Sequence, residues 1–143
     1  MRAIIRNPLV VVAVSLLLPA CQRAVQVTSD GPAPTVNPDF TVDQNLVGQG
    51  RSAWVSKGCG GCHSIGQGKR AGPDLLGVTE RRTIEWLNEW LKDTDKMLDS
   101  DPIGQAMLQE YNNQRMPDMG LSDEQVTALI HYMADETNDR RGP

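Results

Sequence analysis

The chain has 143 residues, a formal net charge of −4, and aromatic side chains at 4% of its positions. This length predicts one domain with room for a targeting segment, and the negative charge argues against a nucleic-acid partner. A small domain buries only part of its surface, and with so few large rings this one has little material for a core. A bulky apolar cofactor would supply that material.

Residues 1–20 have the pattern of a secretory signal peptide. Arg2 and Arg6 form a short basic start, and residues 9–18 form a largely apolar run. This run is too short for a transmembrane helix, which needs about 20 apolar residues, but it suits an export signal. We therefore expect removal of residues 1–20 and export to the periplasm or the outer face of the cytoplasmic membrane.

The sequence from Leu18 to Cys21, L-P-A-C, resembles a bacterial lipobox. The resemblance implies lipid on Cys21, with plain secretion as the alternative. Bacterial lipoproteins carry more than one acyl chain on this cysteine, which anchors more firmly than the marginal binding of a single chain. Residues 21–42 contain three prolines and no helical period. They predict a flexible tether between the lipid and a domain at 43–143.

Helical signals occur in four segments of this domain, at about 44–57, 83–92, 101–111 and from 122 onward. Gly58 is a usual helix end, and Thr83 and Asp101 are suitable N-caps, the latter with proline in the next position. Ser122 opens a capping box. Residues 64–82 are rich in glycine and basic residues and are expected to form a loop. Because no segment reads as a strand, the sequence predicts an all-α domain with long loops.

Cys59, Cys62 and His63 lie within five residues, in the order C-x-x-C-H. Such spacing serves a redox disulfide, a metal site or covalent haem attachment. A thioredoxin-type disulfide belongs to a βαβ context, and no strands are expected here. A structural zinc site usually needs four ligands, and the other histidine, His131, is expected on the solvent side of the last helix. C-x-x-C directly followed by histidine is the signature of c-type haem.

The haem signature has a mechanical reason. Two thiols add to the two vinyl groups at one edge of the porphyrin, and the next residue brings its imidazole under the iron. Haem on Cys59 and Cys62 and lipid on Cys21 leave no cysteine unassigned. Export is consistent with this assignment, because c-type haem is attached outside the cytoplasm. We predict one covalent haem c with His63 as an axial ligand of its iron.

Over most of residues 44–136 the chain resembles the class I cytochrome c family. The matching motifs are C-x-x-C-H after the first helix, Gly72-Pro73-Asp74-Leu75 for G-P-x-L, Met116-Pro117 for the ligand methionine, and Ser122-Asp123-Glu124 at the start of the last helix. The family also packs a glycine of the first helix against an aromatic residue of the last, here Gly50 and Tyr132. The resemblance implies a small cytochrome c fold of about four helices around one covalent haem.

The resemblance implies that Met116 is the second axial ligand, because the ligand of the family usually stands in M-P. Met119, in the same loop, is the alternative. Met97, Met107 and Met133 lie near helices and are expected to be flexible packing groups.

The resemblance also implies that the carbonyl group of Pro73 orients His63 by accepting a hydrogen bond from its ring. Arg81 and Arg82 are candidates to neutralise the haem propionates, and Trp86 or Trp90 to donate an indole N–H group to one. Of these four residues, the expected site includes Arg81 and Trp86. The alternatives are solvated loop charges for the arginines and an apolar core face for the tryptophans.

With His63 and Met116 as axial ligands the iron has no open position, and the thioether raises its reduction potential. We expect a one-electron carrier that is not an enzyme, takes no small-molecule substrate and serves redox proteins such as a respiratory complex, oxidase or reductase. Without residues 1–20 the chain has 12 basic and 18 acidic residues, a net charge of −6 that favours basic partners. The alternatives are a haem domain serving a copper enzyme or copper-insertion system, a ligand-binding sensor, and a peroxidase-like protein.

Overall fold

The computed structural model describes residue 37 and residues 39–142. Its elements in chain order are α1 (Gln44–Ser56), η1 (Cys59–Gly61), α2 (Val78–Arg81), α3 (Ile84–Lys92), α4 (Thr94–Ser100), α5 (Pro102–Glu110) and α6 (Asp123–Arg141). No strand forms within these residues, where pairing is limited to an isolated bridge between Ser64 and Asp74. The all-α prediction is therefore confirmed, and the four expected helices are α1, α3, α5 and α6.

The helix ends follow the capping residues of the sequence. The side chain of Thr83 accepts a hydrogen bond from the backbone N–H of Trp86 at 3.1 Å, which starts α3. Asp101 caps α5 and is followed by proline at the first helical position. Ser122 and Gln125 exchange side-chain and backbone hydrogen bonds in the predicted capping box of α6. Side-chain oxygens thus satisfy N–H groups that have no partner inside the helix.

Two short helices were not predicted. α4 lies between the second and third expected helices and has seven residues, too few for a hydrophobic period to stand out. Its N-cap is Asp93, the residue that also ends α3. α2 has four residues and interrupts the loop expected at 64–82. Both are short segments whose helical form depends on capping and on neighbours more than on periodicity.

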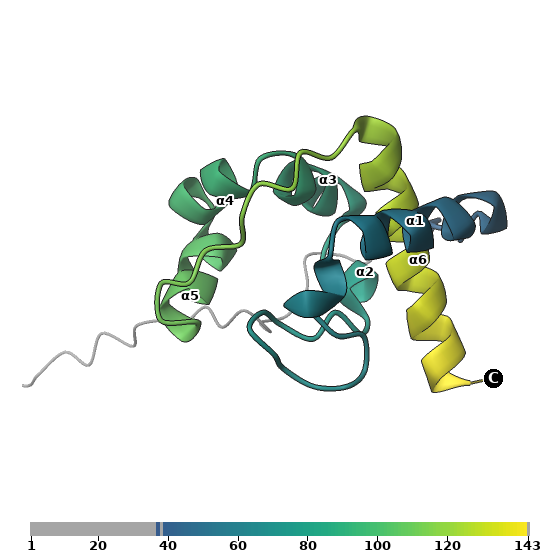
Figure 1. Ribbon diagram of the computed structural model, residues 1–143, viewed down its shortest axis with the longest axis horizontal. Helices are drawn as coiled ribbons and strands as arrows, with labels where there is room; N and C mark the ends of the chain where they lie inside the picture. Colours follow the sequence, from purple (N-terminus) through teal and green to yellow (C-terminus); the bar gives the residue numbers. More distant parts are fainter. Residues whose placement is uncertain (1–36, 38, 143) are drawn as a thin grey trace, which may run out of the picture.

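α1 crosses α6 (Figure 1), and Gly50 of α1 lies against the α6 backbone at this crossing. A Cβ atom on Gly50 would overlap the carbonyl oxygen of Ala128 and lie 2.6 Å from Cβ of Tyr132. Only glycine allows the two backbones to approach this closely. The predicted contact between Gly50 and Tyr132 is confirmed, and Val126 and Ile130 of α6 are fully buried beside it.

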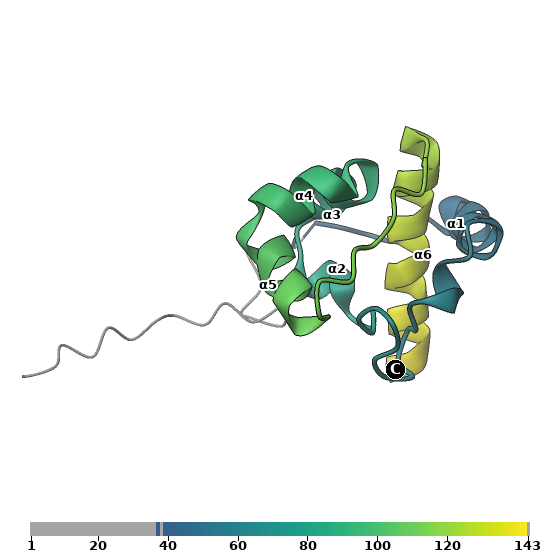
Figure 2. The same cartoon turned by 60° about the vertical axis from the view of Figure 1, so that its left-hand side comes forward.

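The helices form two groups, which Figures 1 and 2 show from two directions. α1 and α6 make up one group, and α3, α4 and α5 lie together in the other. Leu87 of α3 belongs to the same hydrophobic cluster as Val126 and Met133 of α6, so the groups share a core. A long loop leads from the end of α5 to the start of α6 and carries the predicted ligand methionine.

The segment before α1 packs against the domain. Phe40 and Val42 are partly buried against the core, so the packed domain reaches back beyond the expected boundary at residue 43. The expected signal peptide at 1–20, the lipid site at Cys21 and most of the tether at 21–42 lie outside the described residues. Within those residues, every helix is too short or too polar to cross a membrane.

His131 is half-buried and makes specific contacts, so it is not the fully solvated side chain that the sequence predicts. Its Nδ1 atom accepts a hydrogen bond from the backbone N–H of Asp43 at 3.0 Å, and its ring centroid lies 4.9 Å from that of Phe40. Burial lowers the pKa of His131. This histidine attaches the segment before α1 to α6, a contact that helix periodicity alone does not reveal.

Candidate functional site

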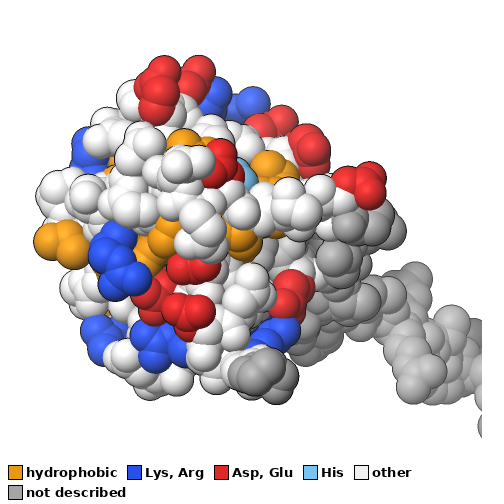
Figure 3. Space-filling view, turned by 90° about the vertical axis from the view of Figure 1, so that its right-hand side faces the viewer, with side chains coloured by type: hydrophobic (Ala, Val, Ile, Leu, Met, Phe, Trp, Pro, Cys, Tyr) orange, Lys and Arg blue, Asp and Glu red, His pale blue; other side chains and the backbone are white. Residues whose placement is uncertain are grey.

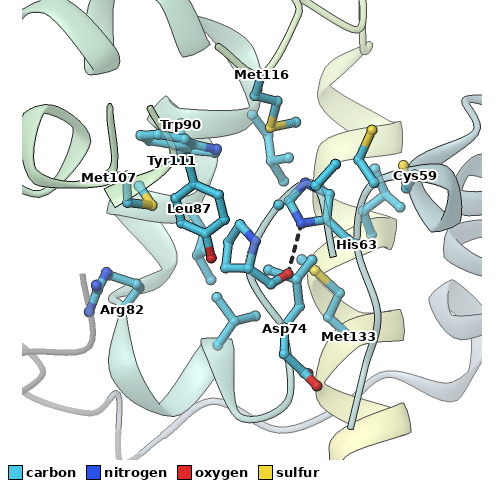
Figure 4. A pocket seen from close by; sticks show the side chains of 18 of the residues that line it. Cys59, His63, Asp74, Arg82, Leu87, Trp90, Met107, Tyr111, Met116 and Met133 are labelled. Atoms are coloured by element: carbon cyan, nitrogen blue, oxygen red, sulfur yellow. Dashed lines mark hydrogen bonds between the residues drawn. The ribbon is translucent and has the colours of Figure 1, made fainter. Parts of the chain in front are cut away.

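One pocket gathers all the residues that the sequence placed in the candidate site: Cys59, Cys62, His63, Pro73, Arg81, Trp86 and Met116. The walls of the pocket come from both groups of helices, with Leu87, Leu91 and Leu129 among the apolar side chains. Figure 4 shows several of these residues converging from separate elements. The described residues contain no group of three or more His, Cys, Asp or Glu side chains placed to bind a metal ion.

The short turn η1 brings the two cysteines and the histidine to the pocket. The N–H groups of Cys62 and His63 both donate to the carbonyl oxygen of Cys59, at 3.2 and 3.0 Å. Cys59 and Cys62 form no disulfide, and burial raises the pKa of the Cys59 thiol. Three reactive side chains therefore occupy one turn at one edge of an apolar pocket, as attachment at adjacent vinyl groups requires.

His63 is held with one ring nitrogen engaged. Its Nδ1 atom lies 3.0 Å from the carbonyl oxygen of Pro73, the contact dashed in Figure 4. Because a carbonyl oxygen can only accept, Nδ1 carries the proton and the lone pair of Nε2 is available to a metal. Burial lowers the pKa of His63, which favours the neutral imidazole that binds iron.

Gly72 lies directly against the His63 ring. A Cβ atom at this position would lie 2.5 Å from Cε1 and 2.8 Å from Nδ1 of His63. Any side chain here would displace the imidazole. The glycine of the G-P-x-L motif thus leaves space for the ring, and the proline supplies the carbonyl group that orients it.

Asp74, the variable residue of that motif, organises the loop around His63. Its carboxylate accepts hydrogen bonds from the N–H groups of Gly66, Gly68 and Leu76 at 2.7, 2.5 and 2.9 Å. Burial alone would raise the pKa of Asp74, but these backbone donors outweigh it and lower the pKa to about 2. Sequence reasoning missed this role, which appears only when the folded loop gathers the three donors.

Trp86 offers the pocket a buried donor. Its Nε1 atom is buried and has no hydrogen-bond partner among the described residues, and its ring stacks on Trp90 with centroids 5.0 Å apart. A buried indole N–H without an acceptor is costly. A haem propionate at this edge would accept a hydrogen bond from the Trp86 indole. The buried N–H group is therefore consistent with the haem that Cys59 and Cys62 indicate.

The two neighbouring arginines differ in their surroundings. Arg81 lines the pocket, but its guanidinium donates to the backbone carbonyl groups of Leu76 and Asp74. Arg82 also lines the pocket and is 6% exposed, with its guanidinium 5.4 Å from the centroid of the Trp86 ring. Arg82, considered from the sequence but not included in the candidate site, is therefore the more deeply buried positive charge.

The methionines separate into two classes. Met116 lines the pocket, as Figure 4 shows, and so do Met107 and Met133. Met119 is not among the lining residues, and Met97 is buried elsewhere in the core. Met116 is thus the methionine of its loop that faces the same pocket as His63.

Comparisons with known proteins agree with this site. The family model described as cytochrome c matches residues 47–136. A cytochrome c from Rhodothermus marinus is 29% identical over 75% of this chain and 90% of its own, with a TM-score of 0.64. The cytochrome c domain of the pp3183 protein from Pseudomonas putida is 41% identical over 62% of this chain and 87% of its own, with a TM-score of 0.55. No curated protein matches significantly.

The family match covers more than half of the chain and includes the C-x-x-C-H turn, the G-P-x-L loop and Met116. The pocket supplies two unpaired thiols, a histidine with Nε2 available and an orphan indole donor. These residues fit a covalently attached haem c. The chain therefore belongs to the cytochrome c family and is a haem c electron-transfer protein.

Proposed function

We propose that this protein is a membrane-tethered, extracytoplasmic one-electron carrier whose single haem iron is bound by His63 and Met116. One observation carries the ligand assignment: the available Nε2 atom of His63 and the Met116 thioether belong to the same pocket, whereas Met119 does not line it. Bound haem c supplies a one-electron iron couple.

The side chains of the chain itself account for the proposed properties. Pro73 fixes the ring orientation of His63, and the Met116 thioether is a ligand type that raises the reduction potential. Apolar walls keep water away and disfavour the more highly charged ferric state. Because His63 and Met116 would both be occupied in holding the iron, no position would be left for a substrate, so the chain is proposed not to be an enzyme.

A pair of matched variants tests the ligand assignment. The ferric wild type should show the weak red absorption band that accompanies an iron–thioether bond. Met116→Ala should abolish this band, and Met119→Ala, a change of the same size in the same loop, should leave it in place. Loss of the band in Met119→Ala alone would assign the ligand to Met119 and overturn the proposal.

Membrane tethering is proposed from the lipobox-like sequence that ends in Cys21. Cell fractionation of a Cys21→Ser variant tests it, with mass spectrometry of the mature N-terminus of the wild type. We expect acyl chains on wild-type Cys21 and movement of the variant from the membrane to the soluble exported fraction. A wild-type N-terminus without lipid would leave an exported but untethered carrier.

The partners are proposed to be redox proteins with a basic docking surface. Residues 84–110, which include α3, α4 and α5, carry seven acidic and two basic side chains. The face formed by α1 and α6 shows both signs interspersed (Figure 3). Complementary charge raises association rates and is screened by salt. Electron transfer with a true partner should therefore slow as ionic strength rises.

Carbon monoxide separates the proposal from its alternatives. A six-coordinate carrier should bind this gas slowly in the reduced state, because Met116 must leave first. Rapid binding by the wild type would favour a sensor or a peroxidase-like protein. Service to a copper enzyme or copper-insertion system would change the partner and leave the chemistry of the site intact.

A further inference from the structure

The loop that carries Met116 is fixed by side chains and not by backbone pairing. The peptide groups of residues 115–121 form no backbone–backbone hydrogen bond with any residue that the structure describes. A loop without such bonds has many accessible conformations. The position of Met116 therefore depends on the few side chains that bind this loop to neighbouring elements.

Arg115, directly before Met116, provides the first of these contacts. Its Nη2 atom donates to Oδ1 of Asp95 at 2.8 Å, and its Nη1 atom donates to Oδ1 of Asp99 at 2.9 Å. Nε and Nη2 add bonds to the carboxylate and carbonyl oxygens of Asp95 at 3.1 and 3.2 Å. The two aspartates stand four residues apart on one face of α4, where they would repel each other without the arginine.

The strength of this contact comes from its geometry. The carboxylates are 64% and 68% exposed, and a single ion pair with such exposure contributes little. An arginine that joins several charges in a network is the recognised exception, because its planar guanidinium has donors in a fixed fork. This contact attaches the Met116 loop to the second helix group.

Lys57 provides the second contact, on the other side of Met116. Its Nζ atom donates to the carbonyl oxygens of Met119 and Gly120, both at 2.9 Å. Lys57 is the C-cap residue of α1 and precedes the turn that holds Cys59. This contact attaches the loop to the first helix group, next to the haem-attachment motif.

We propose that Arg115 and Lys57 form a two-ended clamp that positions Met116 on the iron, an inference that rests on the proposed His63 and Met116 ligation. Both are positioning residues that act through the loop backbone. The Arg115 side chain also borders the pocket, but its guanidinium donates to Asp95 and Asp99. The clamp holds the chain at Arg115 and at Met119, so Met116 between them presents its thioether to the pocket. The clamp also explains the position of Met119. Its carbonyl oxygen accepts a hydrogen bond from Lys57, and its side chain does not line the pocket.

The test measures how fast carbon monoxide binds to the reduced holoprotein, since binding requires Met116 to leave. We expect Arg115→Gln to accelerate binding by up to about fivefold, the factor that corresponds to the upper end of the range for exposed ion pairs. Lys57→Gln should accelerate it several-fold. Arg115→Lys keeps the charge without the fork and should fall between Arg115→Gln and wild type.

A thermodynamic cycle shows whether Arg115 acts through α4. The double variant Asp95→Asn, Asp99→Asn should reproduce the rate of Arg115→Gln, and combining all three changes should add nothing further. Higher ionic strength should speed binding in the wild type and leave Arg115→Gln unchanged, because salt screens only an intact ion pair. If Arg115→Gln fails to fold, the double aspartate variant, which should still bind carbon monoxide faster than the wild type, and the salt dependence of the wild type carry the test.

Arg51→Gln is the matched control. It removes the ion pair between the exposed Arg51 and the largely buried Glu136, which are 3.0 Å apart. This pair joins α1 to α6, and neither residue lines the haem pocket. Its carbon monoxide rate should equal that of the wild type. An equal acceleration in Arg51→Gln would mean a general loss of stability and would overturn the clamp.

The two proposals fail in different ways. If the iron–thioether band survives Met116→Ala, the ligand assignment is wrong and the clamp fails with it. If Met116→Ala removes the band but Arg115→Gln, Lys57→Gln and the double aspartate variant bind carbon monoxide at the wild-type rate, the ligation stands and the clamp is overturned.

Discussion

The crossing of α1 and α6 and the loop that carries Met116 are stabilised by different kinds of contact. α1 and α6 meet at Gly50 with almost no space between their backbones, beside fully buried apolar side chains of α6. The Met116 loop reaches α4 and α1 mainly through Arg115 and Lys57. Salt screens exposed ion pairs and so weakens them, whereas apolar packing has no charge to screen.

This difference separates attachment of the haem from positioning of the ligand methionine. The turn with Cys59, Cys62 and His63 follows directly from α1, so close packing fixes the element to which the haem is bonded. The methionine side is held by contacts that salt or a single substitution can weaken. The turn that binds the haem covalently is therefore held rigidly by α1, which we call the attachment side. The stability of the Met116 loop can change without affecting it.

The largest expected effect follows removal of both attachment thiols. A Cys59→Ala, Cys62→Ala variant should lose most of its helical circular dichroism, because the pocket walls would lack the ring on which they pack. Hydrogen exchange should show α3–α5 losing protection before α1 and α6. A fully helical variant would contradict the need for the cofactor, and uniform loss of protection would contradict the contrast between the groups.

Close packing at the helix crossing is tested by Gly50→Ala. A Cβ atom there would overlap the Ala128 carbonyl oxygen, so we expect about 3 kcal/mol or more of lost unfolding free energy in denaturant titrations of the holoprotein. The control is Gly48→Ala in the same helix, where a Cβ atom meets nothing within 4 Å. It should stabilise by about 0.5–1 kcal/mol, and similar losses in both variants would refute the packing argument.

Asp74 is the polar exception within the attachment side. Its pKa of about 2 in the folded protein lies below the ordinary value of 3.8. Its contribution is therefore complete above pH 3.8 and is lost as the pH falls toward 2. Because the carboxylate is partly exposed, we expect Asp74→Asn to cost on the order of 1 kcal/mol at neutral pH. Acid titrations should show a flatter stability profile for the variant below pH 3.8, and parallel profiles would contradict this role.

The smallest expected effect is that of Arg51→Gln on stability. Its ion pair with Glu136 also joins α1 to α6, but the arginine side chain is 58% exposed, and Glu136, which is 13% exposed, keeps Arg140 as a second partner. Such pairs contribute about 0–1 kcal/mol, so the thermal midpoint should hardly change. A large decrease would mean that charge, and not packing, holds the first helix group together.

Local signals in the sequence predicted the features that depend on neighbouring residues in the chain. Caps at Thr83, Asp101 and Ser122 marked three helix starts, and C-x-x-C-H marked the attachment turn. α4 escaped prediction because it is short and begins at the residue that ends α3.

Features that depend on contacts formed only in the folded chain could not be predicted from the sequence. Arg81 and Arg82 are indistinguishable in sequence, yet only the fold buries Arg82 and turns Arg81 toward loop carbonyl groups. Asp74 becomes important because the loop folds around it. Arg115 was not considered, since its aspartate partners stand on the helix that was missed.

A redox titration of the purified protein, followed by mixing the reduced form with carbon monoxide, tests the central claim most directly. We predict a single one-electron wave at a high potential and a reduced haem spectrum that changes only slowly after mixing. A protein without haem absorption, or one whose reduced spectrum shifts at once under carbon monoxide, would contradict an iron held on both sides by this chain.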